Sequence, residues 1–255
     1  MAKHPAPEVL YPDVAARGSL RAALQALADE GGLSVPFTAE DPGALTYAVV
    51  ESRLPHRKRL LVNSWVHKRR WSIRGEETIQ GLALVQGDTD DLAQVARAAH
   101  VWHNGAALGD IRAAAPFVRL TGRFEVPDHD PVRLAESEWQ HMRTEAGEQD
   151  WPAYQALVEA AYAEPALRAL YPFSSHWTLR FSATTRPRLT ITGPCLLALG
   201  VEEYLVSKGF TGADPLARTT TAQEAVAAAV RHLPAGLGPV ASGAFDDETG
   251  RTAPQ

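Results

Sequence analysis

The sequence predicts an α+β protein with two similarly built lobes of short antiparallel strands plus helices, joined by a helical middle segment. One group of strand-like runs lies between residues 45 and 86, a second lies between 176 and 207, and each is followed by an amphipathic helical pattern. The 255 residues suit one large domain or two of roughly 100–150 residues. We expect a flexible N-terminus (1–18), an N-terminal lobe (19–126), a helical connector (127–170), a C-terminal lobe (171–240) and a disordered tail (241–255).

In the N-terminal lobe, Ser19 is a suitable N-cap for a helix that ends near Gly31. Four strands are expected, at 45–52, 59–66, 68–74 and 78–86. A helix capped by Thr89 or Asp90 then continues to Gly105, and a shorter one covers 108–115.

The connector carries an acidic helical pattern over 127–150, and a second helix begins after Asp150. In HWTLRFS (176–182) apolar and polar residues alternate, which indicates a half-buried strand. Further strands are expected at 188–192, 195–199 and 203–207. Thr221 and Glu224 form a capping box for the last helix.

Composition excludes several classes of protein. The chain is 45% hydrophobic and 22% charged, with a net charge of −5, and no apolar run reaches the roughly 18 residues of a membrane span. Cys195 is the single cysteine, so no internal disulfide can form. The beginning of the chain lacks the apolar core of a signal peptide, so we expect a cytoplasmic protein with no membrane partner.

The charges are unevenly distributed. Residues 53–74 hold eight Lys or Arg and no acidic residue, whereas 125–164 are mostly acidic. Arg69, Arg70 and Trp71 in the basic segment are candidate binding residues, and an acidic leader peptide or carrier protein is the preferred partner. The negative net charge argues against nucleic acid. Two solvated faces of opposite sign explain the same residues.

Several motifs between 19 and 240 point to a known family: AYAEPALRALYPFSSHWTLRFS (161–182), the run from Asp91 through Trp102 to Gly105, and Glu224-Ala225-Val226 with Leu233-Pro234. In these motifs the chain resembles an actinobacterial family of unknown function, usually labelled a natural product biosynthesis protein. The resemblance implies a role in secondary metabolism. It implies no reaction, cofactor or catalytic residue.

The densest polar cluster lies within the first of these motifs: Glu164, Arg168, Ser174, Ser175, His176 and Arg180. On a continuous strand His176 and Arg180 would point to the same face. His176 could then move a proton, Arg180 could hold a carboxylate or enolate, and Ser175 could donate a hydrogen bond or act as a nucleophile. Glu164 and Arg168 are candidate substrate-binding residues. The structural alternative is an ion pair between Glu164 and Arg168 at helical spacing.

A second candidate is the segment His100 to Asn104. His100 and His103 share a helix face, but no third ligand follows at a recognisable spacing, so we expect no metal. Trp102 and His103 remain candidate substrate-binding residues. Dinucleotide, P-loop and serine-hydrolase motifs are missing, so we expect no cofactor. Cys195 lies in an apolar run and is expected to be buried and inert.

These observations lead to an accessory or tailoring protein of natural-product biosynthesis that acts on a small-molecule or peptide intermediate. If it is catalytic, the expected chemistry is cofactor-independent proton transfer, cyclisation or elimination. Two alternatives remain open. One is a non-catalytic adaptor that binds a peptide or a carrier protein, and the other is an immunity or self-resistance protein.

Overall fold

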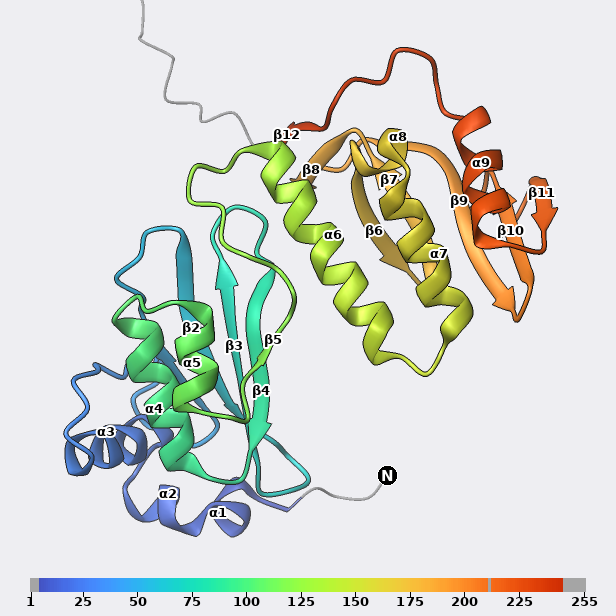
Figure 1. Ribbon diagram of the computed structural model, residues 1–255. Helices are drawn as coiled ribbons and strands as arrows, with labels where there is room; N and C mark the ends of the chain where they lie inside the picture. Colours follow the sequence, from blue (N-terminus) through green and yellow to red (C-terminus); the bar gives the residue numbers. More distant parts are fainter. Residues whose placement is uncertain (1–4, 211, 245–255) are drawn as a thin grey trace, which may run out of the picture. The chain divides into compact units, whose positions relative to one another are not determined.

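A computed structural model describes residues 5–210 and 212–244. The chain forms two α+β units, the first ending at Thr121 and the second beginning at Gly122. Each unit has a five-stranded antiparallel sheet with helices packed on it, so the predicted fold class is confirmed (Figure 1).

The sheet of the first unit has the order β1-β2-β3-β4-β5. Its strands are β1 (Tyr47–Val50), β2 (Arg57–Ser64), β3 (Trp71–Glu77), β4 (Ala83–Thr89) and β5 (Arg119–Leu120). The first four lie within a few residues of the expected strands. The two-residue β5 was not expected, because so short a strand leaves no periodic pattern.

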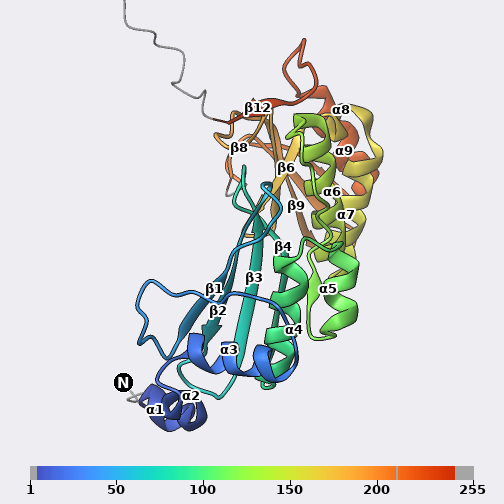
Figure 2. The ribbon, with the colours of Figure 1, turned by 90° about the vertical axis from the view of Figure 1, so that its left-hand side faces the viewer.

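Three helices pack against this sheet: α3 (Leu20–Glu30), α4 (Leu92–His103) and α5 (Leu108–Ala114) (Figure 2). The short helices α1 (Pro7–Leu10) and α2 (Pro12–Ala16) pack against each other, and α2 packs against α3. The Ser19 hydroxyl caps α3, whereas Asp91, one residue beyond the expected caps, caps α4. Residues 5–18, expected to be flexible, are folded, with Tyr11 and Val14 fully buried; residues 1–4 lie outside the described residues.

The sheet of the second unit has the order β11-β10-β9-β7-β6. Its strands are β6 (Tyr171–Ser175), β7 (Thr178–Ser182), β9 (Ile191–Gly200), β10 (Glu203–Ser207) and β11 (Pro215–Thr219). A separate parallel pair joins β8 (Thr184–Pro187) to β12 (Ala241–Gly243). The strands expected at 188–192 and 195–199 are one strand, β9, with a register shift opposite β7.

The helices of the second unit are α6 (Pro131–Glu148), α7 (Pro152–Ala163), α8 (Pro165–Arg168) and α9 (Ala222–Arg231). The first three correspond to the expected connector, but α6 and α7 contribute buried residues to the same core as the second sheet, so they belong to that unit. The capping box of Thr221 and Glu224 on α9 is confirmed. Of the expected disordered tail, 241–244 are described and include β12, and 245–255 lie outside the described residues. None of the helices described here is both long and apolar enough to cross a membrane.

Candidate functional site

The hairpin between β6 and β7 contains the expected catalytic residues. Ser175 pairs with Thr178, so His176 and Trp177 form a two-residue turn, with φ of 49° and 62°. Both residues occupy the left-handed region, as a type I′ turn requires. The expectation that His176 lies on the same strand as Arg180 was therefore wrong: the strand begins at Thr178, because the chain reverses direction at 176–177.

Arg180 lies on the face of the sheet opposite the helices. Its neighbours Leu179 and Phe181 are in the helix-side core, so alternation directs Arg180 to the other face. The guanidinium carbon lies 5.2 Å from the ring centres of both Phe173 and Phe210. The Arg180 Nε atom is buried without a hydrogen-bond partner among the described residues, although the side chain as a whole is only half-buried.

The turn brings His176 to the same aromatic side chain. Its imidazole lies 5.6 Å from the Phe210 ring in an edge-on arrangement, and Ser175 Oγ lies 3.3 Å from its Nδ1 atom. Phe210 thus contacts both the imidazole and the guanidinium. We call Phe173, Ser175, His176, Arg180, Cys195 and Phe210 the hairpin cluster.

Cys195 is a buried member of the hairpin cluster. It is buried on β9, next to Leu196 of the helix-side core and therefore on the same face as Arg180. Burial raises the pKa of its thiol, and the nearby Arg180 charge opposes that shift only in part. The neutral thiol therefore dominates at neutral pH, in keeping with the inert role expected for this residue.

Trp177, the second residue of the turn, packs against two aromatic residues at the start of α7. Its ring, 41% exposed, packs edge-on against Trp151 and Tyr154, with ring centres 6.1 and 5.4 Å away. A β-turn with two non-glycine residues at positive φ is strained by about 1 kcal/mol or more per residue. The aromatic contacts of Trp177 act against this strain, because such ring pairs contribute about 0.5–1.5 kcal/mol each.

Glu164 and Arg168 do not form the expected ion pair. The Glu164 carboxylate accepts a hydrogen bond from the Ala166 backbone and caps α8. Arg168 instead pairs with Glu136 of α6 at 3.0 Å, and its guanidinium lies over the Tyr162 ring. Arg168 and Glu136 are 32 residues apart in the sequence, so no local pattern predicts this pair.

Arg168 and Glu136 line an open groove of about 540 Å³ beside α8. Glu136 also accepts hydrogen bonds from Tyr162 and Gln140. This groove lies on the helical side of the sheet, because α6 and α8 supply its walls, and so it is distinct from the hairpin cluster.

The candidates in the first unit are mostly structural. Trp71 and Trp102 are fully buried, and the Trp102 indole donates to the Lys58 carbonyl, so both rings are core residues with no surface to offer a substrate. His103 is tied to the Glu51 carbonyl at 2.7 Å and His100 to the Ser34 carbonyl at 3.1 Å. No cluster of three metal-ligating side chains occurs in the described part of the chain.

Most cations of the basic segment have partners inside the first unit. Arg69 makes two hydrogen bonds to Asp13, Arg59 lies near Glu40, and Lys58 and Arg74 both reach Glu76. Arg70 packs over the Trp65 ring.

The loop that carries Arg69 and Arg70 is held by Tyr11. The Tyr11 hydroxyl lies 2.7–3.1 Å from the carbonyl oxygens of Trp65, Lys68 and Arg70. These contacts, together with the ion pairs, support the interpretation of the segment as a solvated, internally paired face.

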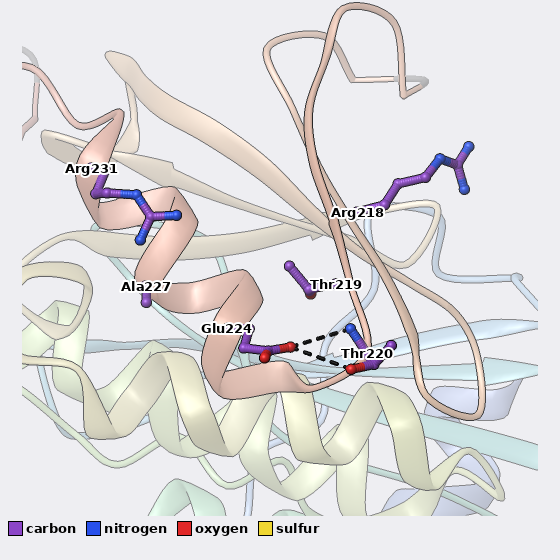
Figure 3. A pocket seen from close by; sticks show the side chains of 6 residues that line it. All are labelled: Arg218, Thr219, Thr220, Glu224, Ala227 and Arg231. Atoms are coloured by element: carbon purple, nitrogen blue, oxygen red, sulfur yellow. Dashed lines mark hydrogen bonds between the residues drawn. The ribbon is translucent and has the colours of Figure 1, made fainter.

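Sequence reasoning missed Phe210 and a second feature of the same sheet. Phe210 follows β10 in a loop without periodicity, and so nothing in its surroundings marked it. The second feature is an open groove between β11 and α9, which Figure 3 shows; β11 itself was not expected.

Residues 133–244 match the model of a family of unknown function (DUF6193). The match lies within the second unit and includes the hairpin cluster and the β11–α9 groove. No curated protein and no solved structure gives a significant match.

Proposed function

We propose that the second unit binds a small carboxylate-bearing intermediate at the hairpin cluster and moves a proton on it. The chain would then be a cytoplasmic tailoring protein of natural-product biosynthesis that works without a cofactor. The observation that carries the proposal is the Arg180 guanidinium, whose central carbon lies 5.2 Å from two phenyl ring centres and whose buried Nε–H finds no acceptor among the described residues.

An unpaired buried donor of this kind is unfavourable by about 1–3 kcal/mol. A carboxylate or enolate oxygen of a ligand would accept this hydrogen bond and be held by the fixed charge of the guanidinium. Phe173 and Phe210 favour a ligand with an apolar or aromatic body, because both rings lie close to the guanidinium.

His176 supplies the proton-transfer group. Imidazole exchanges protons near neutral pH, and the ring of His176 contacts the same Phe210 side chain as Arg180. The imidazole would remove a proton from an atom next to the bound carboxylate, and Arg180 would stabilise the negative charge that forms. Isomerisation, elimination or cyclisation can each follow from that step.

The first test is binding. We expect benzoate or cinnamate to raise the Tm of the purified chain and to leave the Tm of the Arg180→Gln variant unchanged. As a matched control, Arg112→Gln removes an exposed arginine of α5 and should retain the wild-type response. Equal responses in the wild type and Arg180→Gln would refute carboxylate binding at this site.

The second test is metabolic. We expect deletion of the gene in its source organism to change the metabolite profile, and complementation with the wild type, but not with Arg180→Gln, to restore it. An unchanged profile after deletion would contradict a role in biosynthesis.

A further inference from the structure

The open groove between β11 and α9 has a volume of about 410 Å³ (Figure 3). It is lined by Arg218, Thr219, Thr220, Glu224, Ala227 and Arg231. One wall is a strand and the other is a helix. No residue of the hairpin cluster lines this groove, so the two sites are distinct.

The strand wall is the edge of the sheet. β11 pairs with β10 on one side, and no strand in residues 5–210 or 212–244 pairs with its other side. An edge strand presents backbone N–H and C=O groups that can pair with another chain. Pro215 blocks only the first position of β11, which leaves Leu216 to Thr219 able to pair.

The helix wall provides room and positive charge. Ala227 is the residue of α9 that faces the groove between Glu224 and Arg231, and its methyl side chain leaves space above the strand. Arg231, in the last turn of α9, forms no ion pair with any residue that the structure describes. Figure 3 shows its guanidinium extending from the helix toward the strand side.

The single carboxylate that lines the groove is already engaged. Glu224 accepts hydrogen bonds from the Thr220 and Thr221 backbone in the capping box of α9. On β11, Arg218 extends to the side of the strand away from α9, where it is paired with Glu203 at 3.0 Å (Figure 3). Arg231 is therefore the cation that can exchange solvent for a carboxylate of a ligand in this groove.

We propose that this groove binds an extended acidic peptide, which adds to β11 as a further antiparallel or parallel strand and places carboxylates against Arg231. A strand on one side and a helix on the other is the arrangement used by domains that bind peptides through strand addition. Main-chain hydrogen bonds to β11 supply affinity. Arg231 selects acidic side chains.

The proposal also gives a location for an acidic partner. The basic segment 53–74 is a weaker candidate, because Lys58, Arg59, Arg69 and Arg74 have carboxylate partners within the first unit. Arg231 has none in the described chain.

The test uses the full chain and two fluorescein-labelled heptapeptides, Val-Glu-Val-Glu-Val-Glu-Val and the same peptide with Lys in place of Glu. We expect the acidic peptide to bind at least tenfold more tightly than the basic one in fluorescence polarisation. Arg231→Glu should weaken its binding at least tenfold. The matched charge reversal Arg112→Glu, on an exposed position of α5 in the first unit, should leave it unchanged.

Hydrogen exchange then tests the strand pairing. Backbone amides within 216–219 should become protected when the acidic peptide is bound. Equal affinity for the two peptides, unchanged affinity in Arg231→Glu, or protection confined to another part of the chain would each overturn the proposal. Because the probes do not involve Arg180 or His176, this result is independent of the hairpin cluster.

Discussion

Arg123 donates hydrogen bonds of 2.6 and 2.9 Å to the two carboxylate oxygens of Glu138, and both side chains are at least nine-tenths buried. The pair joins the segment that leads into the second unit to the middle of α6. A buried pair of this kind is strongly destabilising when only one partner is removed, because the other charge is left without compensation.

We therefore expect Glu138→Ala to lower the free energy of unfolding of the second unit by about 3–5 kcal/mol. The double variant Arg123→Met, Glu138→Leu should recover much of this loss, because neither charge is then buried. As a control, Arg133→Ala breaks an exposed pair with Asp128 and should change the free energy of unfolding far less, because solvent screens this pair. Urea denaturation followed by tryptophan fluorescence measures all three; a Glu138→Ala effect as small as the control would contradict the prediction.

Gly75 in β3 makes room for the Trp102 indole. A Cβ atom at this position would lie 2.6 Å from Trp102 Cη2 and 2.9 Å from Val85 Cγ2. Gly75→Ala should therefore destabilise the first unit by about 1–3 kcal/mol, the usual result of overpacking a core. Gly200→Ala in β9 is the matched control, since no atom lies within 4 Å of its added Cβ. Equal midpoints of thermal unfolding for the two variants would argue against close packing at Gly75.

The fold class was predictable because it depends on periodicity. Strand β2 and helix α4, for example, each bury mainly one face, and that period is present in the sequence. The strand expected to be half-buried, β7, is instead buried on both faces, since Thr178 and Ser182 are buried as well as Leu179 and Phe181. Short elements such as β5 and α8 have too few residues to show a period. The break expected at Gly193-Pro194 is instead an irregularity within β9: Gly193 has a φ of 68°, and its missing Cβ leaves space for Leu233.

The candidate site was only partly predictable. His176 and Arg180 both contact Phe210, but they do so across a turn that alternation cannot reveal, because Asn and Gly are the usual residues at such a turn and neither is present. Long-range pairs such as Arg168 with Glu136 leave no local pattern in the sequence, since only tertiary packing brings them together.

Tyr154 gives the second unit a pH dependence. Burial raises the pKa of its hydroxyl to about 12, and the nearby Ser174 hydroxyl only partly opposes this shift. In the unfolded chain a tyrosine ionises near pH 10, so the contribution of Tyr154 to stability is complete below that pH and is lost as pH rises from 10 towards 12. The unfolded state loses its proton first, which favours unfolding.

We expect Tyr154→Phe to remove this pH dependence. The free energy of unfolding of the variant, relative to that of the wild type, should therefore rise by about 1 kcal/mol between pH 8 and pH 11. Urea denaturation at the two pH values measures the difference. A constant difference between wild type and Tyr154→Phe across this range would mean that the tyrosine ionises at its ordinary pKa.

His176 allows the roles of fold and chemistry to be separated. It occupies the first position of the turn with a φ of 49°, a conformation that asparagine adopts more readily than most residues. We expect His176→Asn to leave the free energy of unfolding unchanged or to raise it by up to about 0.5 kcal/mol, because the turn is relieved of strain while Trp177 keeps its packing on Trp151 and Tyr154.

The same variant removes the imidazole from the hairpin cluster. If His176 transfers the proton, the variant should still be stabilised by benzoate through Arg180 but should fail to restore the metabolite profile of the deletion strain. Full restoration by His176→Asn would remove His176 from the mechanism, and loss of the benzoate response would show that the histidine acts on binding rather than on proton transfer.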